Sequence, residues 1–425
     1  MSTTDVVIIG QGYVGLPLAV RAAECGLRVV GLDLDDRTVA ALNAGRSHVD
    51  DVSDEVLRRT LDRGYVATAD SAVIAEADTV LVCVPTPLTE DGGPNLSAVT
   101  AAARSIGEHI GPGALVVLES TTYPGTTEEI FAPLVTRSGL RAGQDIFIAF
   151  SPERVDPGNA VYNLHNTPKV VGGLTPECTA RAVAFYRRLV DEVVVAKGTR
   201  EAEMSKLLEN TFRHVNIAMV NEMLRFCDDL QIDLWDAIDC AATKPFGYMA
   251  FRPGPGVGGH CIPVDPSYLS YRVRARLGYA FRMVELAEEI NAAAPGYVAS
   301  RAWRALNDLK KPVNGSTVLL VGVTYKPDIA DLRQSPAEPL AIRLADWGAN
   351  VGYFDALVPL WQPRNWVGCK PPIGHGDLGR ASSEADLVVL LQPHRDIDLV
   401  ALTQSSDCLL DTRGVVPPAP NVIRL

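Results

Sequence analysis

The chain has 425 residues, of which 47% are hydrophobic and 21% are charged, and its formal net charge is −12. This length exceeds what one hydrophobic core usually supports, so we expect two or three domains. The acidic balance argues against nucleic acid as a partner, because binding a phosphate backbone requires a basic face. The N-terminal residues resemble neither a signal peptide nor a membrane span, which predicts a cytoplasmic protein with no membrane attachment.

The cysteine pattern argues against cross-links and metal. The eight cysteines include no CxxC pair and no cluster with the spacing of zinc ligands. We therefore expect reduced thiols, no disulfide framework and no bound metal. Because the net charge is −12, an anionic ligand must be bound by local arginines, lysines or backbone amides.

The N-terminal part alternates strand-length apolar runs with helical patterns, which is typical of a parallel α/β sheet. Strands are expected at residues 6–9 and 28–33, with a helix over 16–25. Between the first strand and the helix lies a GxGxxG motif, and Asp33 follows its last glycine by 18 positions. Such glycines permit a tight turn and a close approach of the backbone to a pyrophosphate at a helix N-terminus.

Asp33 bears on the choice of cofactor. A carboxylate at this position suits hydrogen bonds to ribose hydroxyls and repels a 2′-phosphate, which favours NAD over NADP, although Arg37 tempers that preference. The predicted contacts to NAD in this segment are Gly10, Gly12, Tyr13, Val14, Gly15, Asp33 and Arg37.

Polar residues follow three further predicted strands, at 79–85, 114–119 and 146–150. They are Thr86, Thr121 and the pair Glu153-Arg154. Ligands of open α/β sheets bind outside the carboxyl ends of the strands, so these side chains are expected to line one crevice. Helix capping is the alternative role for the two hydroxyls.

Residues 201–243 predict one long, unbroken helix, which suits a spine or a subunit contact. Lys206 and Asn210 are four apart on it, so they share a face and can direct donors into the crevice; ordinary surface exposure is the alternative. After a linker at 310–315, a second α/β unit is predicted, with strands at 317–323, 351–355, 387–391 and 408–411. Lys326 and Arg333 follow its first strand, where cations can bind a phosphate or a carboxylate.

The glycine-rich stretch 254–265 contains Cys261 and Asp265. A four-electron oxidation of an alcohol to an acid benefits from a thiol, because the aldehyde can be held as a thiohemiacetal and oxidised to a thioester before hydrolysis. A small buried hydrophobe is the alternative interpretation of this cysteine. His260 receives no role, since adjacent side chains in an extended loop often point apart.

Together these motifs resemble the UDP-glucose/GDP-mannose dehydrogenase family, nucleotide-sugar 6-dehydrogenases that use two NAD to convert a C6 alcohol into a carboxylate. The resemblance covers nearly the whole chain, at residues 10–15, 84–87, 151–154, 206 with 210, 258–265, 325–327 and 333–336. It implies two Rossmann-like parallel-sheet domains joined by a long central helix. The implied division is an NAD-binding domain at 1–199, a central helical dimerisation domain with the catalytic loop at 200–309, and a nucleotide-sugar-binding domain at 310–425.

The resemblance also implies roles for individual residues. Cys261 is matched to the nucleophile, and Lys206 and Asn210 to groups that stabilise oxyanion and alkoxide states. Thr121 and Asp265 are matched to residues that position water and assist proton transfer, and Glu153 to the general base of thioester hydrolysis. The implied substrate contacts are Glu153, Arg154, Lys206, Asn210, Arg252, Gly258 and Lys326, with Arg252 reaching a neighbouring subunit of a homodimer or larger homo-oligomer. The implied cofactor contacts add Thr86, Thr121 and Arg333.

The sugar is predicted from finer features. The stretches SPERVDPG and GPGVGGHCIPVDP resemble the branch acting on UDP-N-acetylglucosamine or UDP-N-acetylmannosamine more than the UDP-glucose branch, in which a second glutamate usually follows the first by four positions. Here that position is Pro157. A 6-dehydrogenase of UDP-glucose or another nucleotide-linked glucose is the first alternative. A two-electron β-hydroxyacid dehydrogenase and a non-catalytic NAD-binding scaffold are the remaining ones.

Overall fold

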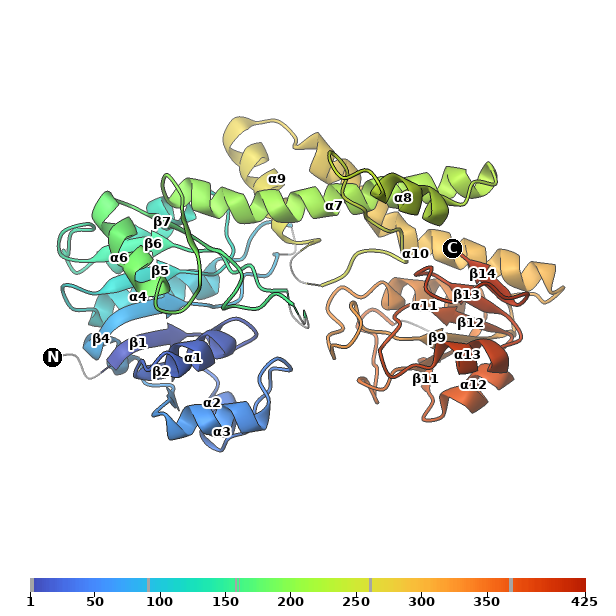
Figure 1. Cartoon of the computed structure of the whole chain (residues 1–425), viewed down its shortest axis with the longest axis horizontal. Coiled ribbons are helices and arrows are strands. Elements are labelled where there is room, and N and C mark those ends of the chain that lie inside the picture. The colour runs from blue at the N-terminus through green and yellow to red at the C-terminus, as the bar shows by residue number, and fades with distance from the viewer. Residues whose placement is uncertain (1–3, 90–91, 157–158, 160, 260–261, 367–369) are drawn as a thin grey trace. The chain divides into compact units, whose positions relative to one another are not determined.

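The computed structural model describes residues 4–89, 92–156, 159, 161–259, 262–366 and 370–425. It divides into two compact units (Figure 1). Unit 1 comprises Met1–Glu209 with Ser267–Tyr279, and unit 2 comprises Asn210–Pro266 with Ala280–Leu425. The three-domain division with boundaries after residues 199 and 309 stays a prediction. No helix in the described ranges is long and apolar enough to cross a membrane.

Unit 1 is built on a sheet with the strand order β3-β2-β1-β4-β5-β6-β7-β8 (Figure 1). The first six follow the order 3-2-1-4-5-6 of doubly wound dinucleotide-binding folds, which confirms the predicted fold class. The strands are β1 (Thr4–Ile9), β2 (Val29–Leu32), β3 (Val66–Thr68), β4 (Ala77–Val82), β5 (Leu115–Leu118), β6 (Phe147–Phe150), β7 (Lys169–Gly173) and β8 (Val193–Val195).

Two apolar layers cover the sheet of unit 1. Along β1, Val6 and Ile8 belong to one buried cluster and Val7 and Ile9 to the other, because successive side chains point to opposite faces of a strand. Burial on both faces explains the near-continuous apolar runs in the sequence. The helices are α1 (Gly15–Glu24), α2 (Asp36–Asn43), α3 (Asp54–Asp62), η1 (Ser71–Glu76), α4 (Ser97–His109), η2 (Thr127–Phe131), α5 (Ala132–Val135) and α6 (Pro176–Tyr186).

The direction of β7 departs from the all-parallel pattern. Phe150 in β6 pairs with Gly172 in β7 in antiparallel fashion, while β7 and β8 run parallel to each other. The start of β7 therefore lies at the same edge of the sheet as the carboxyl ends of β4, β5 and β6. The sequence patterns did not predict β3, β7 or β8.

The helix predicted over 201–243 is not unbroken, because residues 230–233 interrupt it. The structure has α7 (Thr199–Asp229) and a separate helix α8 (Leu234–Ala242). Gln231 adopts φ 57°, and the N–H of Ile232 donates to the carbonyl of Cys227, five residues back, as in a helix-ending Schellman turn. Asp233 then caps α8 by accepting hydrogen bonds from the backbone of the next turn.

Unit 2 repeats the same strand order around a second sheet, β11-β10-β9-β12-β13-β14. Its strands are β9 (Thr317–Val321), β10 (Asn350–Phe354), β11 (Ile373–Gly374), β12 (Leu387–Leu390), β13 (Leu409–Asp411) and β14 (Val422–Arg424). Its helices, besides α8 and the second part of α7, are α10 (Arg282–Asp308), α11 (Ala337–Asp346), α12 (Leu378–Glu384) and α13 (Leu399–Ser405). The remaining helix, α9 (Asp265–Leu277), begins in unit 2 and continues in unit 1.

Candidate functional site

The loop between β1 and α1 has the geometry of a dinucleotide cradle. Gly10 adopts φ +90°, and a Cβ there would lie 2.6 Å from the carbonyl oxygen of Cys83. A Cβ on Gly15 would lie 1.8 Å from the carbonyl oxygen of Gly10, so both positions require glycine. A Cβ on Gly12 would meet no atom within 4 Å. The backbone at Gly12 therefore borders open space beside a helix N-terminus, and a pyrophosphate fits there.

Asp33 is fixed at the carboxyl end of β2. One carboxylate oxygen accepts a hydrogen bond of 2.8 Å from the backbone N–H of Gln11, and the other accepts one of 3.0 Å from Asp35. The carboxylate is thereby tied to the glycine loop. Tyr13 and Val14 are half-buried in the turn before α1, whereas Arg37 is exposed in the first turn of α2.

Thr86 and Thr121 lie side by side beyond the ends of β4 and β5. The Thr86 hydroxyl donates a hydrogen bond of 2.9 Å to the Thr121 carbonyl. Sequence reasoning expected both hydroxyls at the carboxyl edge of the sheet, and the structure brings the two residues together there. The Thr121 side chain takes no part in this hydrogen bond, since the acceptor is the backbone carbonyl of Thr121.

Glu153 lies beyond β6 in a well-defined electrostatic setting. One of its oxygens accepts hydrogen bonds from the backbone N–H groups of Arg154, at 2.7 Å, and Val155, at 2.5 Å. Burial raises the pKa of Glu153, but the charge of Lys169, the two backbone donors and the charge of Lys206 together lower the pKa below its ordinary value. Glu153 is therefore held as a carboxylate in unit 1.

Arg154 and Lys206 frame the same segment. The Arg154 guanidinium pairs with Glu209 at 2.8 Å and donates to the carbonyl of Pro168 at 2.7 Å. Lys206 is 9% exposed in α7, so this residue is buried rather than exposed on the surface of the helix. The predicted face shared by Lys206 and Asn210 is thus buried at both positions, since Asn210 is 8% exposed.

The sequence predictions missed two charged residues next to Glu153. Lys169 begins β7 and is 3% exposed, and Glu119 follows β5 and is 1% exposed, so both residues are buried. Their ammonium and carboxylate groups lie 2.6 Å apart. The signal that could have found them is a charge at the end of a wholly apolar strand, because such residues are rarely buried without a partner.

In unit 2, Asn210 and Asp265 form a buried pair. The Asn210 side-chain amide donates to the Asp265 carboxylate at 2.5 Å, and Asp265 is 3% exposed. Asp265 is the first residue of α9, where the helix dipole favours a negative charge. Sequence reasoning assigned both residues to the site separately, and the structure joins them.

The glycine-rich loop before α9 is anchored at two points in unit 2. The N–H of Gly254 donates to the side chain of Asn221 at 3.0 Å, and the N–H of Gly259 donates to the carbonyl of Arg333 at 2.9 Å. A Cβ on Gly258 would lie 2.6 Å from Cβ of Tyr325, so only glycine fits this contact. Cys261 and His260 lie outside the described residues.

The loop after β9 carries Lys326 and Arg333, both half-buried. Arg333 forms an ion pair with Asp331 of the same loop, at 2.5 Å. His394 also binds this loop, because its Nδ1 accepts a hydrogen bond of 2.9 Å from the N–H of Asp328. Nε2 of His394 faces the buried Asp355 carboxylate at 3.1 Å. Sequence reasoning missed His394 and Asp355.

Arg252 is exposed and forms an ion pair with Asp239 of α8. This pairing holds the Arg252 guanidinium on the surface of unit 2. The contact of Arg252 with a neighbouring subunit stays a prediction.

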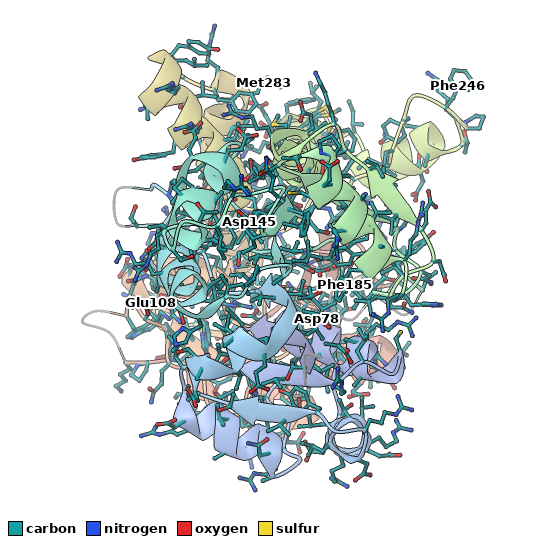
Figure 2. All side chains as sticks on the ribbon, turned by 90° about the vertical axis from the view of Figure 1, so that its left-hand side faces the viewer. Asp78, Glu108, Asp145, Phe185, Phe246 and Met283 are labelled. Atoms are coloured by element: carbon teal, nitrogen blue, oxygen red, sulfur yellow. The ribbon has the colours of Figure 1, made fainter. Side chains whose placement is uncertain are left out.

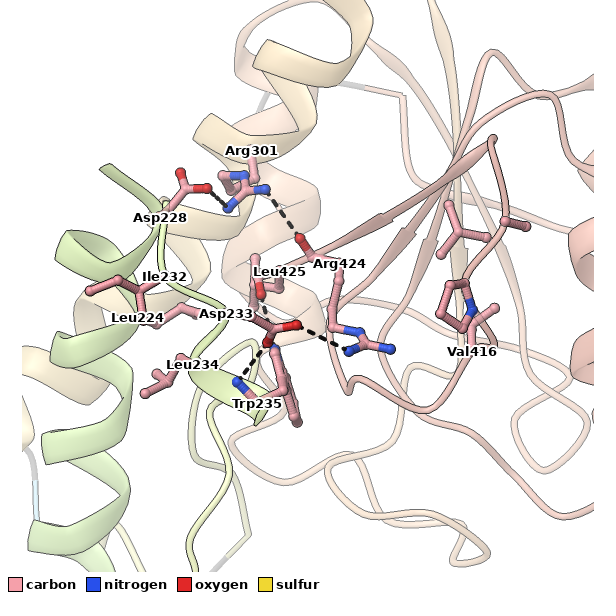
Figure 3. A pocket seen from close by; sticks show the side chains of 13 residues that line it. Leu224, Asp228, Ile232, Asp233, Leu234, Trp235, Arg301, Val416, Arg424 and Leu425 are labelled. Atoms are coloured by element: carbon pink, nitrogen blue, oxygen red, sulfur yellow. Dashed lines mark hydrogen bonds and ion pairs between the residues drawn. The ribbon is translucent and has the colours of Figure 1, made fainter. Parts of the chain in front are cut away.

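A cavity of about 320 Å³ lies elsewhere in unit 2, between the ends of α7 and α10 and the C-terminal residues (Figure 3). Its charged lining residues pair with one another, Asp228 with Arg301 at 2.8 Å and Asp233 with Arg424 at 3.9 Å. None of the residues predicted for cofactor or substrate lines this cavity. We assign it no role in the site.

Comparisons with known proteins agree with this arrangement. Three models of the UDP-glucose/GDP-mannose dehydrogenase family match: the NAD binding domain at residues 4–190, the central domain at 200–293 and the UDP binding domain at 319–418. The chain is 38% identical to a UDP-N-acetyl-D-mannosamine dehydrogenase of Salmonella typhimurium, over 98% of this chain and 100% of that protein.

Two further proteins extend the similarity. An NDP-N-acetyl-D-galactosaminuronic acid dehydrogenase of Ralstonia nicotianae is 36% identical, over 96% of this chain and 95% of that protein. The solved structure of a UDP-D-ManNAc dehydrogenase from Pyrococcus horikoshii matches with a TM-score of 0.88 and 30% identity, over 99% of this chain and 98% of that chain. The resemblance inferred from the motifs is thereby confirmed, and the chain belongs to the UDP-glucose/GDP-mannose dehydrogenase family.

Proposed function

We propose that this chain oxidises the C6 alcohol of UDP-N-acetylmannosamine or UDP-N-acetylglucosamine to the uronic acid. As a member of its family, the chain is an NAD-dependent nucleotide-sugar dehydrogenase. The observation that carries the four-electron proposal is the buried Asn210–Asp265 pair, since Asp265 follows Cys261 by four residues. A two-electron dehydrogenase needs neither a thiol nor an amide-paired carboxylate four positions after it in the sequence.

The cofactor is assigned to the cradle in unit 1. Gly10, Gly12 and Gly15 would hold the pyrophosphate, and Asp33 would bind the ribose. NAD, when bound, supplies the hydride acceptor for both oxidation steps. Thr86 and Thr121 border the same edge of the sheet and would position the reacting end of the ligands.

The thiol chemistry is assigned to unit 2. The Cys261 thiol adds to the carbonyl carbon of the aldehyde, and the oxygen of the resulting adduct gains negative charge that requires donors. Asn210 offers one amide N–H to that oxygen, because its other N–H is committed to Asp265. Lys206 would contribute the positive charge, and Asp265 would also accept or return a proton.

Hydrolysis of the thioester requires a base. Glu153 is held as a carboxylate, and one of its oxygens is already bound by two backbone N–H groups. The other oxygen would take a proton from the attacking water, whose oxygen bonds to the thioester carbon as the carbon–sulfur bond breaks, and would return that proton to the sulfur, which releases the carboxylic acid and the Cys261 thiol. Arg154, Arg252, Gly258 and Lys326 complete the proposed substrate contacts, and Arg333 the proposed cofactor contacts.

A homodimer in the cytoplasm is part of the proposal. Phe212, Met219 and Phe226 recur every seven residues on α7, and their side chains are 48%, 46% and 46% exposed. Such heptad spacing places apolar side chains in one stripe, which suits pairing with another helix. In Figure 2, Phe246 and Met283 also extend from the ribbon, and they are 70% and 58% exposed. Sedimentation equilibrium of the protein at several concentrations measures the subunit number directly.

The test of the activity is the number of NADH released per sugar consumed. Purified protein is supplied with UDP-N-acetylmannosamine, UDP-N-acetylglucosamine, UDP-glucose and UDP-N-acetylgalactosamine in parallel, the last because of the Ralstonia relative. We expect about two NADH per sugar with one of the first two. One NADH per sugar would favour a two-electron reaction, and no NADH from any of the four would contradict the proposal. Cys261→Ser should abolish turnover while NAD still binds.

A further inference from the structure

A buried cluster of charges surrounds Glu153 at the carboxyl edge of the sheet in unit 1. The Lys169 ammonium lies 2.6 Å from one oxygen of Glu119 and 3.5 Å from one oxygen of Glu153. The side chains are 3%, 0% and 15% exposed, respectively. The Tyr186 hydroxyl donates to the other oxygen of Glu119, and the Lys169 ammonium also lies 5.4 Å from the centre of the Tyr186 ring. The proposed chemistry assigns no task to Glu119, Lys169 or Tyr186.

The antiparallel strand explains how Lys169 comes to this edge. Phe150 of β6 pairs with Gly172 of β7, so the residues that precede Gly172 lie beyond the carboxyl end of β6. Glu119 directly follows β5, the other neighbour of β6. The two residues therefore approach Glu153 from both sides of the strand that leads to it. The hydroxyl of Ser151 donates to the carbonyl of Val170 at 2.8 Å and fixes the two strand ends to each other.

The cluster treats the two oxygens of Glu153 differently. One oxygen is saturated by the backbone N–H groups of Arg154 and Val155. The other faces Lys169, but at 3.5 Å, the limit of a hydrogen bond, because the ammonium lies close to Glu119. A buried ammonium needs a carboxylate partner, and Glu119 provides one without using Glu153. The second oxygen of Glu153 thus keeps a lone pair for a proton.

We infer that Glu119 and Lys169 are positioning residues for Glu153: Glu119 holds the ammonium at the distance where it keeps Glu153 ionised without occupying the oxygen that accepts the proton. This inference rests on the proposed role of Glu153 as the base of thioester hydrolysis. It assigns a function to the buried Glu119–Lys169 ion pair. Removing the charge of Glu119 and removing the charge of Lys169 should shift the titration of Glu153 in opposite directions.

Other groups also act on Glu153 within the described part of unit 1. Lys206 of α7 adds positive charge, and Arg154 adds its guanidinium, which is paired with Glu209.

Burial raises the pKa of Cys83 and the pKa of Tyr186 well above their ordinary values, so both groups are uncharged near neutral pH. Burial raises the pKa of Glu119 as well, while Lys169 and Tyr186 favour its ionised form. Mutation of Glu119 or Lys169 therefore changes the net charge near Glu153.

The experiment measures the titration of the Glu153 carboxyl directly, by difference infrared spectroscopy of the whole protein between acid and neutral pH. The band that disappears in Glu153→Gln identifies the group, with or without turnover. Glu119→Gln keeps the shape of the side chain but removes its charge, so the ammonium acts on Glu153 alone and the titration midpoint should fall by about one pH unit. Lys169→Met removes the cation, and the midpoint should rise by about one unit or more.

Several controls make the outcome decisive. Lys169→Arg restores a cation and should return the midpoint towards the wild-type value. Glu108→Gln removes one partner of an exposed ion pair with Arg137 in the same unit and should leave the midpoint unchanged. If Lys169→Met does not fold, the direction of the shift in Glu119→Gln decides by itself.

The inference and the proposed function fail in different ways. An unmoved Glu153 midpoint in Glu119→Gln, or shifts of the same sign in both variants, would overturn the inference. If instead the midpoint moves as expected and the acid limb of the pH–rate profile moves with it, the inference holds and the role of Glu153 in hydrolysis is supported. Full hydrolysis activity in Glu153→Gln would count against the proposed base and not against the tuning of its carboxyl.

Discussion

At the scale of single residues, a substitution of Gly12 should affect ligand binding without affecting the stability of the fold. Replacing it with alanine adds a Cβ that meets no protein atom within 4 Å, so the melting temperature should not change. The new methyl group would stand where we propose that the pyrophosphate approaches the backbone, and overpacking of this kind costs about 1–3 kcal/mol. We therefore expect the Kd for NAD to rise about 5- to 160-fold in Gly12→Ala, measured by calorimetric titration.

The matched control for this variant is Gly111→Ala, in the same unit, where the nearest atom to an added Cβ is 4.0 Å away. It should bind NAD like the wild type. Equal NAD affinity in Gly12→Ala and the wild type would place the cofactor elsewhere.

Asn210 is the second residue whose contacts lead to a clear expectation. Its side chain is buried, and one amide hydrogen is committed to Asp265. If the other stabilises the oxyanion, Asn210→Ala should lower kcat by about 10²–10³, the usual loss for one such donor. NAD affinity should stay unchanged, because the cradle lies in unit 1.

Asn216→Ala serves as the control, since Asn216 lies on the same helix but is half-buried and donates to the carbonyl of Phe212 within that helix. Steady-state kinetics of both variants would decide. A fall in kcat of similar size in Asn216→Ala would show that damage to α7, not loss of a donor, explains the effect.

At the scale of elements, the packing of Gly258 fixes the glycine-rich loop that precedes Asp265. Gly258→Ala would place a Cβ 2.6 Å from Tyr325 and 2.7 Å from the carbonyl oxygen of Gln334, so the loop must move away from its anchor. We expect kcat to fall at least about tenfold, since small displacements of reacting groups are costly. Gly376→Ala, whose added Cβ meets nothing within 4 Å, should behave like the wild type in the same assay.

The elements also show what sequence alone could predict. The glycine loop and Asp33 were within reach, because a strand, a tight turn and a helix that follow one another in the chain fix their geometry locally. The direction of β7 was not, because a short run such as residues 169–173 does not show which way its strand runs, and that direction depends on the strand with which it pairs in the sheet. With that direction unknown, Lys169 could not be placed beside Glu119 and Glu153.

The end of α7 is a similar case. Helix ends are usually recognised by glycine or asparagine in the left-handed conformation, but here Gln231 adopts it. The remaining signal was Asp233, a good N-cap for α8, in a stretch that otherwise continues the apolar pattern of a helix. Pairing of Asn210 with Asp265 was equally hidden, since 55 residues separate them.

At the scale of the whole molecule, two units with the same strand order carry different ligand chemistry. Unit 1 has the glycine cradle and Asp33 at the carboxyl edge of its sheet, whereas the corresponding loop of unit 2 carries Lys326 and Arg333 and no GxGxxG motif. Each unit packs around its own buried clusters. The UDP binding domain model matches residues 319–418, within unit 2.

This division predicts separate footprints for the two ligands in hydrogen–deuterium exchange. NAD alone should protect the backbone amides around residues 10–15 and 33–37, because the ligand contacts those N–H groups and stabilises the state that binds it. UDP alone should instead protect residues 322–336, where the backbone of the loop after β9 is held by Asp331 and His394. In Gly12→Ala the NAD footprint should weaken at equal ligand concentration while the UDP footprint remains. Protection by UDP in the glycine cradle, with none at 322–336, would show that the nucleotide of the substrate binds in unit 1 and would reverse the assignment of the two sheets.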